Sequence, residues 1–543
     1  MQVEGLDATV IDYIDEIKTG YENQIREYEN QIKESKEHFE HQIHKLKNEA
    51  IEYQNKYLEI KERYDLEIYK RYMRSAEQIP VDDKQQSLFN SEEEPAETAG
   101  QDGEGEKTEV RTYHRMKRGR KPIDPRIRRE TVIIDIPEEE KTCACGARLT
   151  KIGEETSEKL EFIPQRIYVK QVRRLKYACR SCEGTEDEER PAVRMAPVPP
   201  SIMPRGIASP SLLSAIFTHK FEDHLPYYRQ ERQFGRIGVE ISRQDMSNWQ
   251  RQACDRLGPL FAIMKKTVKS GPVIQMDETP VQVIGEKGRE DGHKSYMWLA
   301  RGGPPGKKVA WYEYHKTRAG ENAKDFLEGY SGYLQTDGYG GYDTAVKGLG
   351  GIIHVGCFAH ARRKFFEASK VAERPESAEE GIKHIRNLYR LEDELRGQNL
   401  GDEEFLAKRK ARAGPMLEKF YSWLVKRKEK DKVLDSGLMG KAINYSLGQW
   451  DKMAAYLESP YLTPDNNACE NAIRPFVLGR KNWLFCQSPE GAESSCGIYT
   501  LIETARQNGI VPAHFLTALF ERAPFASSAE DWEKLLPWNI FTA

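Results

Sequence analysis

The hydrophobic pattern at the start of the chain predicts one long helix. Between Val10 and Tyr64, apolar residues recur at alternating steps of three and four, separated by Glu, Lys, Gln and Asn and without a proline. This spacing predicts a coiled-coil seam that associates with a second copy of the chain or with another helix. A solvated, charged helix without a partner is the alternative, because tyrosine is an imperfect seam residue. In either case this segment carries no catalytic group.

A helical region precedes the strands. One helix is expected to end near Arg236, followed by a turn at Gly238 and by Ser242 as the N-cap of a second helix. That second helix carries Arg243, Gln244 and Asn248. The pattern has the outline of a helix-turn-helix with polar residues where base contacts would lie. An ordinary helical hairpin has the same outline.

After Gly271 the pattern changes to the shorter period of strands. Five strand-like segments follow, at 271–284, 294–302, 307–317, 332–343 and 351–360. Two of them place an aspartate beside strand residues, Asp277 and Asp337, and a third acid, Glu470, follows a helix start at Pro464–Asn466. Carboxylates from two strands and a helix can converge on one side of a sheet, where they suit Mg²⁺ or Mn²⁺. Spacing alone is weak support, because the chain has 86 acidic residues.

Charge is distributed unevenly along the chain. The 543 residues sum to a net charge of −3 with a pI near 6.5, which excludes a uniformly basic nucleic-acid-binding chain. An acidic stretch at 91–110 is followed by a basic one at 111–130. In the basic stretch, Arg118, Arg120 and Lys121 flank Gly119 and resemble a short minor-groove hook, with a solvated basic tether as the alternative.

Cysteine usage points to a structural metal and a reducing compartment. The chain has nine cysteines, an odd number that suits reduced thiols better than a secreted disulfide framework. Two close pairs, Cys143 with Cys145 and Cys179 with Cys182, have the layout of a zinc ribbon that binds one structural Zn²⁺. The acidic N-terminus does not resemble a signal peptide, and no apolar run approaches the roughly 20 residues of a membrane span. We therefore expect a cytoplasmic protein that is not bound to a membrane.

Several long motifs in order resemble the large transposase of the IS66 family of bacterial insertion sequences. The resemblance covers nearly the whole chain and is carried by GRKPIDPRIRRETVIIDIP, KYACRSC, LPYYRQER, MDETPVQV, LQTDGYGGYD, CFAHARRKFFEA, DNNACENAIRP, LGRKNWLF, YTLIETARQNG and LPWN. It implies a DDE transposase with an RNase H-like catalytic domain and, by its matching motifs, the triad Asp277, Asp337 and Glu470. The family usually has a basic residue directly after the glutamate, where this chain has Asn471.

The resemblance implies a reaction on DNA that uses two Mg²⁺ or Mn²⁺ ions. Water would release a 3′-hydroxyl at the end of the element, and that hydroxyl would attack target DNA. Basic residues near the acids are candidate phosphate contacts, with a basic helix surface as the alternative: His360, Arg362, Arg363, Lys364, Arg474, Arg480 and Lys481. The rival functions are a metal-dependent nuclease that does not join strands and a catalytically silent DNA-binding protein derived from a transposase.

Together these expectations describe a multidomain α+β chain. The expected parts are a coiled-coil helix at 1–80, a disordered linker at 81–130, a zinc-ribbon module at 131–195, a helical DNA-binding region at 196–268, a catalytic domain at 269–500 with a helical insertion at about 366–462, and a C-terminal helical segment at 501–543. The expected partners are the terminal repeats, target DNA, a second copy of the chain through the coiled coil, and small accessory proteins encoded with the element. Such a protein would act at the bacterial nucleoid.

Overall fold

The structure of the protein is a computed structural model. It describes residues 8–72, 167–178, 193–371, 375–430 and 434–542, and the single positions 131, 135 and 144. Contacts divide the chain into two compact units, one formed by Met1–Glu94 with Pro199–Ala543 and the other by Pro95–Val198. The expected hook residues Arg118, Arg120 and Lys121 and the four expected zinc ligands Cys143, Cys145, Cys179 and Cys182 lie outside the described residues.

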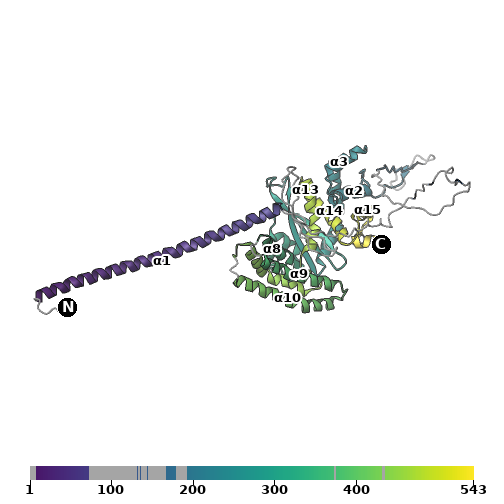
Figure 1. The fold of residues 1–543 in the computed structure, drawn as a ribbon. Coiled ribbons are helices and arrows are strands. Elements are labelled where there is room, and N and C mark those ends of the chain that lie inside the picture. Colours follow the sequence, from purple (N-terminus) through teal and green to yellow (C-terminus); the bar gives the residue numbers. More distant parts are fainter. Residues whose placement is uncertain are drawn as a thin grey trace. The chain divides into compact units, whose positions relative to one another are not determined.

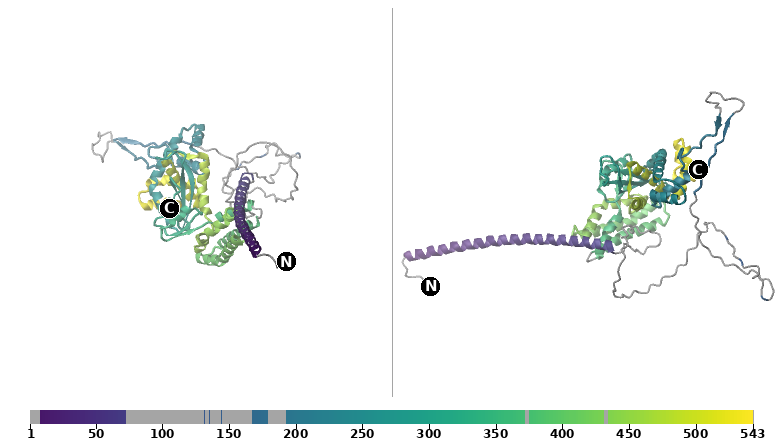
Figure 2. Two further views of the ribbon diagram at one scale, coloured as in Figure 1. Left: turned by 90° about the vertical axis from the view of Figure 1, so that its left-hand side faces the viewer. Right: turned by 90° about the horizontal axis from the view of Figure 1, so that it is seen from above.

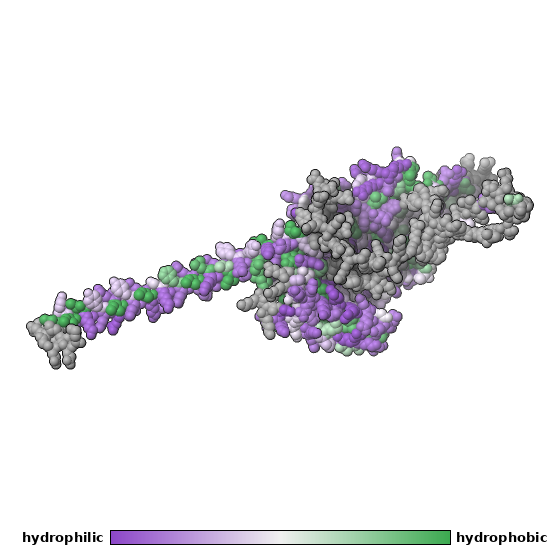
Figure 3. Space-filling model, viewed as in Figure 1, coloured by the Kyte–Doolittle hydropathy of each residue, from purple (hydrophilic) through white to green (hydrophobic). Residues whose placement is uncertain are grey.

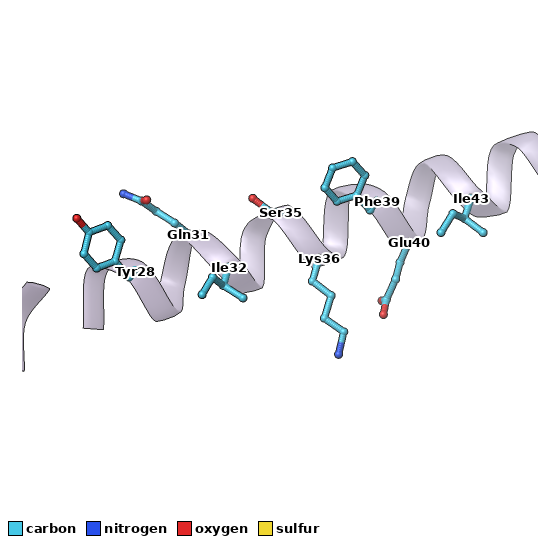
Figure 4. A pocket seen from close by; sticks show the side chains of 8 residues that line it. All are labelled: Tyr28, Gln31, Ile32, Ser35, Lys36, Phe39, Glu40 and Ile43. Carbon is cyan, nitrogen blue, oxygen red and sulfur yellow. The ribbon is translucent and has the colours of Figure 1, made fainter. Parts of the chain in front are cut away.

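The N-terminal helix is confirmed. Helix α1 (Ala8–Tyr72) is continuous over 65 residues (Figure 1). Apolar residues run along it among hydrophilic ones (Figure 3), and they remain exposed, as shown by Ile32 at 68% and Tyr57 at 64%. Figure 4 shows the side chains of α1 that line a surface pocket: Tyr28, Gln31, Ile32, Ser35, Lys36, Phe39, Glu40 and Ile43.

Four helices precede the main sheet in the chain: α2 (Pro210–Phe221), α3 (Tyr227–Arg236), α4 (Arg243–Arg256) and α5 (Gly258–Lys269). The predicted turn between α3 and α4 is confirmed. Gly238 adopts a positive φ of 78°, which glycine tolerates best, and Ser242 caps α4 in a capping box with Asp245.

The main sheet has the strand order β5-β4-β3-β6-β7, with β8 pairing separately with β3. Strand β4 is antiparallel to both of its neighbours, β3 and β5, whereas β6 and β7 run parallel to β3. This mixed sheet is consistent with the expected RNase H-like core. Its strands are β3 (Val273–Val283), β4 (Lys294–Gly302), β5 (Val309–His315), β6 (Gly332–Gln335), β7 (Ile352–Val355) and β8 (Phe485–Cys486).

Helices cover the sheet and close its edge. Between strands lie α6 (Gly320–Leu327) and α7 (Gly340–Val346), and after β8 come α14 (Pro489–Gln507), α15 (Pro512–Arg522), α16 (Ala529–Lys534) and α17 (Pro537–Ile540). At the edge strand β5, the backbone N–H groups of Ala310 and Tyr312 donate to the hydroxyls of Thr504 and Thr500 on α14. The otherwise unpaired edge is therefore satisfied by a helix. One hydrophobic core joins α2–α5, the sheet and α13–α15.

A second hydrophobic core lies in the helices between β7 and the last acid. It is built by α8 (Phe358–Val371), α9 (Glu376–Arg396), α10 (Asp402–Lys430), α11 (Leu438–Gly448), α12 (Trp450–Ala454) and the 3₁₀ helix Ala455–Glu458. These helices form a group of their own beside the sheet (Figure 2). This core reaches the sheet through Val273, Tyr333 and Val355. The expected helical character of 366–462 is thus observed in its described residues.

The other unit is described in part. Strands β1 (Lys176–Ala178) and β2 (Val193–Met195) pair in antiparallel fashion, and Arg174 donates to the carbonyl of Ala196 at 2.8 Å. In the described part of the whole chain, no helix is both long and apolar enough to span a membrane.

Candidate active site

The register of the sheet brings the two aspartates to equivalent positions. Strands β3 and β6 are parallel, and their last paired residues are Gln275 and Gln335. Asp277 and Asp337 each follow two residues later. Asp277 is still within β3, opposite Leu299 of β4, whereas Asp337 begins the loop that leads to α7. Because the two strands are parallel and paired up to Gln275 and Gln335, both acids lie just beyond the last pair, at the same level of the sheet.

Helix α13 (Asn467–Trp483) supplies the third acid and bridges an open stretch of β3. Beyond Gln275, β3 leaves β6, and it pairs with β8 only from Gln282 onwards. At the start of α13, Asn466 donates from Nδ2 to the carbonyl of Met276 at 3.0 Å. Near its end, Arg480 donates to the carbonyl of Pro280. The helix is thereby fixed alongside the strand of Asp277.

Glu470 lies in the first turn of α13, where its backbone N–H donates to Asn466 O at 3.1 Å. A carboxylate at this end is favoured by the partial positive charge of the helix N-terminus. Asn466 is 1% exposed, and its own backbone N–H donates to the Cys357 thiol at 3.3 Å. One buried side chain therefore links the strand of the first acid to the helix of the third.

The acids of the site interact electrostatically. Burial raises the pKa of Asp277 well above its usual range, and the charges of Glu278, Glu470 and Asp337 raise it further. Burial also raises the pKa of Glu470; Arg363 opposes that shift, and Asp465 and Asp337 add to it. Such a group of buried, mutually repelling carboxyls favours a bound cation.

The donors that surround Glu470 fit a divalent metal ion. Glu470 Oε1 is buried and has no hydrogen-bond partner. Asp277 and Asp337 each accept one backbone N–H, from Glu278 and Tyr339 respectively, both at 2.9 Å, so both keep acceptor capacity. Oxygen ligands of this kind suit Mg²⁺ or Mn²⁺. The carboxyl oxygens of Asp277, Asp337 and Glu470 do not all lie within 4.8 Å of one another. Among the described residues, the group of three possible metal ligands whose ligand atoms lie that close together is Cys357, His360 and Glu470.

His360 lies beside the third acid. Its Nδ1 is 3.7 Å from Glu470 Oε1, and burial lowers the pKa of its imidazole. The sequence predicted a phosphate contact for His360 but did not predict its place against Glu470 or the part of Cys357. The Cys-x-x-His spacing directly after a strand was the available signal, although it is short and unspecific.

A second acid next to Asp277 has a different role. Glu278 pairs with Arg318, whose Nη2 lies 2.5 Å from Glu278 Oε1, and it accepts the hydroxyl of Tyr342. The Arg318 guanidinium lies over the ring of Tyr339 at 3.8 Å, and the backbone N–H of Tyr339 holds Asp337. The carboxylate of Glu278 therefore bonds to protein groups and, through Arg318, stabilises the loop that carries Asp337.

The basic residues expected to contact DNA occupy unlike environments. Arg362 is 7% exposed, so its guanidinium is not offered on the surface, and Arg480 is bonded to Thr279 and Pro280. Arg363 lies near Glu470, and Lys364 lies over the ring of Tyr445 at 4.9 Å. Arg474 is half-buried, whereas Asn471 and Lys481 are exposed.

Helix α4 presents the expected polar residues on its outer side. Arg243 and Gln244 are exposed, and Gln244 donates to Asn248 at 3.2 Å. The opposite side of α4 is buried through Met246, Trp249, Gln250 and Ala253, and Gln250 donates to Ser494 of α14 at 2.7 Å. The hairpin of α3 and α4 thus packs directly on α14.

Comparison with known proteins identifies the family. The model described as "Transposase IS66 family" matches residues 205–494, more than half of the chain, and this range contains all three acids. The chain belongs to the IS66 family of transposases. The family's zinc-finger domain matches residues 140–183, and its C-terminal element matches residues 500–538.

Relatives that match over most of their own length and most of this chain are also found. Three proteins of Sinorhizobium fredii, named uncharacterized proteins y4hP, y4jD and y4qI, are 32%, 30% and 32% identical to the chain. The matches cover 82%, 76% and 78% of this chain and 81%, 80% and 78% of the relatives.

Family membership gives the chemistry in outline. An IS66 transposase is a DDE enzyme that catalyses phosphoryl transfer on DNA, and the DDE family implies divalent metal ions. The zinc-finger match encloses Cys143, Cys145, Cys179 and Cys182 and implies bound zinc.

Proposed function

We propose that this transposase binds the terminal inverted repeats of its element, cuts the DNA at their 3′ ends and joins the released 3′-hydroxyl to target DNA. The observation that carries the proposal is that Asp277 and Asp337 each lie two residues beyond the last pair of two parallel strands, with Glu470 held alongside by α13. The raised pKa of Asp277, caused by burial and by its acidic neighbours, supports the same grouping.

In this proposal, Asp277, Asp337 and Glu470 hold two Mg²⁺ or Mn²⁺ ions. When bound, the metals activate the attacking oxygen and stabilise the leaving oxygen of the phosphodiester. The protein itself orients the carboxylates. Asn466 fixes α13 against β3, and Tyr339 fixes Asp337 through its backbone N–H.

The proposed DNA-contacting surface draws on polar and basic residues from three parts of the chain. Arg243, Gln244 and Asn248 on α4 would contact bases in the major groove. His360, Arg363 and Lys364 at the start of α8, with Arg474 and Lys481 on α13, would contact phosphates near the acids. In the basic segment, Arg118, Arg120 and Lys121 would enter the minor groove. Arg362 and Arg480 are left out of this surface because the first is buried and the second bonds to β3.

Self-association is proposed through α1. The last turns of α1 contact the insertion through a mostly polar face: Glu62 accepts the backbone N–H of Leu438 at 2.8 Å, and Lys70 pairs with Glu367 at 3.0 Å. The apolar stripe lies on another face and stays exposed, with Ile60 at 66% and Tyr64 at 64%. A second copy of α1 would bury it. Accessory proteins of the same element and the bacterial nucleoid remain the proposed partners and location.

A strand-transfer assay tests the proposal. Purified protein, Mg²⁺ and a pre-cut DNA end should give joined product, and an uncut end should be cleaved at its 3′ side. The Asp337→Ala variant is the control and should do neither while still binding the repeat. Cleavage without joined product would favour a nuclease, and DNA binding without any cleavage would favour the catalytically silent alternative.

A further inference from the structure

The two aspartates are each preceded by a glutamine at the same offset. The sequence has Gln275-Met-Asp277 in one strand and Gln335-Thr-Asp337 in the other. Both glutamines are buried, at 4% and 0% exposure. Glutamine is mostly found at protein surfaces, and a buried amide needs hydrogen-bond partners for all of its polar atoms. Two such residues at one rung of a sheet therefore call for an explanation.

The glutamines belong to a chain of hydrogen bonds that crosses the sheet, which we name the amide ladder. Arg301 on β4 donates from Nη1 to Gln275 Oε1 at 2.8 Å, and Gln275 donates from Nε2 to Gln335 Oε1 at 2.9 Å. Gln335 donates from Nε2 to the carbonyl of Thr463 at 2.6 Å. At the other end, Arg301 Nε donates to Gln507 of α14 at 2.8 Å.

The chemistry of its two ends gives the ladder a single direction. A guanidinium can only donate and a backbone carbonyl can only accept, so the two amides between them have one orientation that satisfies every group. Neither amide can flip without breaking two bonds. The ladder therefore fixes the side chains of Gln275 and Gln335 as well as their backbones.

The ladder ties together the segments that carry the three acids. Gln275 and Gln335 lie two residues before Asp277 and Asp337, and Gln275 points to the same face of β3 as Asp277 because side chains alternate along a strand. Thr463 lies in the segment that leads into α13, and its hydroxyl donates to the carbonyl of Asp465 at 2.6 Å. Asn466 and Glu470 follow directly.

We propose that Gln275 and Gln335 are positioning residues that set the separation of the metal-binding carboxylates through the amide ladder. Neither glutamine touches the metal or the DNA. The inference rests on the proposed assignment of Asp277, Asp337 and Glu470 as the metal ligands. Groups that orient metal ligands in this way commonly change metal affinity by roughly 10–100-fold when they are removed.

The test measures metal affinity without DNA or catalysis. Mn²⁺ binding to the full-length protein is followed by electron paramagnetic resonance for wild type, Gln335→Met and Gln275→Met. Methionine keeps the length of the side chain but cannot continue the ladder. We expect Mn²⁺ to bind about 10-fold or more weakly to both variants, and the Mg²⁺ concentration for half-maximal cleavage to rise in parallel.

Two further variants separate positioning from stability. Gln250→Met removes another buried glutamine, which is 2% exposed and bonds Tyr227 and Ser494 away from the acids. It should lower the melting temperature and leave the Mn²⁺ affinity unchanged. If Gln335→Met does not fold, Arg301→Met takes its place, because it removes the donor end of the ladder, which bonds Gln275 Oε1 at 2.8 Å. It should weaken Mn²⁺ binding in the same direction.

Wild-type Mn²⁺ affinity in the folded ladder variants would overturn the proposal. The Asp277→Ala variant distinguishes a failure of the ladder proposal from a failure of the proposed metal site. If Asp277→Ala loses Mn²⁺ and the ladder variants keep it, only the ladder inference is wrong. If Asp277→Ala also binds Mn²⁺ normally, the proposed metal site is wrong.

Discussion

Asp277 and Asp337 each lie two residues beyond the paired Gln275 and Gln335 of two neighbouring parallel strands. Burial and acidic neighbours raise the pKa of Asp277, so the metal-free site is held together against mutual repulsion. The Asp277→Asn substitution replaces this carboxyl with an amide that cannot ionise. It should abolish cleavage and, by relieving repulsion, raise the melting temperature of the metal-free protein, by about 2–4 °C for each kcal/mol gained.

Calorimetry with and without Mg²⁺ checks this prediction. Mg²⁺ should stabilise the wild type and have a much smaller effect on Asp277→Asn, because ligand binding to the folded state raises stability. Binding of the terminal repeat should persist in gel-shift experiments. A variant that melts lower than wild type without metal would contradict the repulsion argument.

A buried acid outside the site gives a pH prediction. Glu503 on α14 is 2% exposed, and burial raises its pKa to about 7, although Arg506 partly opposes the shift. An acid with a raised pKa in the folded state keeps its proton there while the unfolded chain releases it. Its contribution to stability therefore falls as pH rises from about 4.5 to about 7, and then levels off.

The Glu503→Gln substitution should remove that part of the pH dependence. Relative to wild type, the variant should gain stability between pH 4.5 and 7, by up to about 3 kcal/mol at neutral pH. Urea unfolding at several pH values measures the difference. Parallel stability curves for the two proteins would show that Glu503 titrates normally.

The bond from Asn466 to Met276 gives a prediction about the third acid. Asn466→Ala leaves the Met276 carbonyl without this donor, which costs about 1–3 kcal/mol when the group is buried. It also releases the start of α13, so cleavage should fall and require more Mg²⁺. Asn444→Ala is a matched control, since Asn444 bonds Asp435 at 3.0 Å in the insertion. Equal effects of the two variants on the Mg²⁺ requirement would contradict the positioning role.

Local patterns predicted the elements, but the contacts between elements decided the site. Strand β3 around Asp277 and the turn between Arg236 and Ser242 follow from periodicity and capping. The strands expected at 332–343 and 351–360 end at Gln335 and Val355, and α7 and α8 begin within those ranges. The burial of Arg362 could not be predicted, because the side of α8 that faces the insertion is set by packing against α9 and α11.

The amide ladder and the bonds of Arg480 could not be predicted for a similar reason, because both depend on how the strands pair. The repeated Gln-x-Asp pattern is visible in the sequence, but its pairing depends on the register of β3 with β6. Arg480 was expected to contact DNA, whereas it bonds Pro280 because the side of β3 away from β4 has no strand partner between Gln275 and Gln282. Sequence periodicity does not report such gaps in a sheet.

The zinc module should be separable from the chemistry. Cys179→Ser removes one of four expected thiolate ligands, and because closed tetrahedral sites stabilise their fold directly, bound zinc should fall from about one per chain to near zero. Elemental analysis measures the zinc. Joining of a pre-cut end at high DNA concentration should persist. Normal zinc content in the variant would show that Cys179 is not a ligand.

The exposed stripe of α1 gives the last prediction. Ile32 and Ile43 are 68% and 51% exposed, and each would contribute roughly 1.5–3 kcal/mol if a second helix covered it. Changing both to glutamate places charges in the seam and should convert the assembly to monomers in sedimentation experiments. His41→Glu is the control, because it places a glutamate at position 41, on the opposite side of the helix from position 32. A wild-type protein that sediments as a monomer, or a double variant that keeps the wild-type mass, would show that this stripe is not where two copies meet.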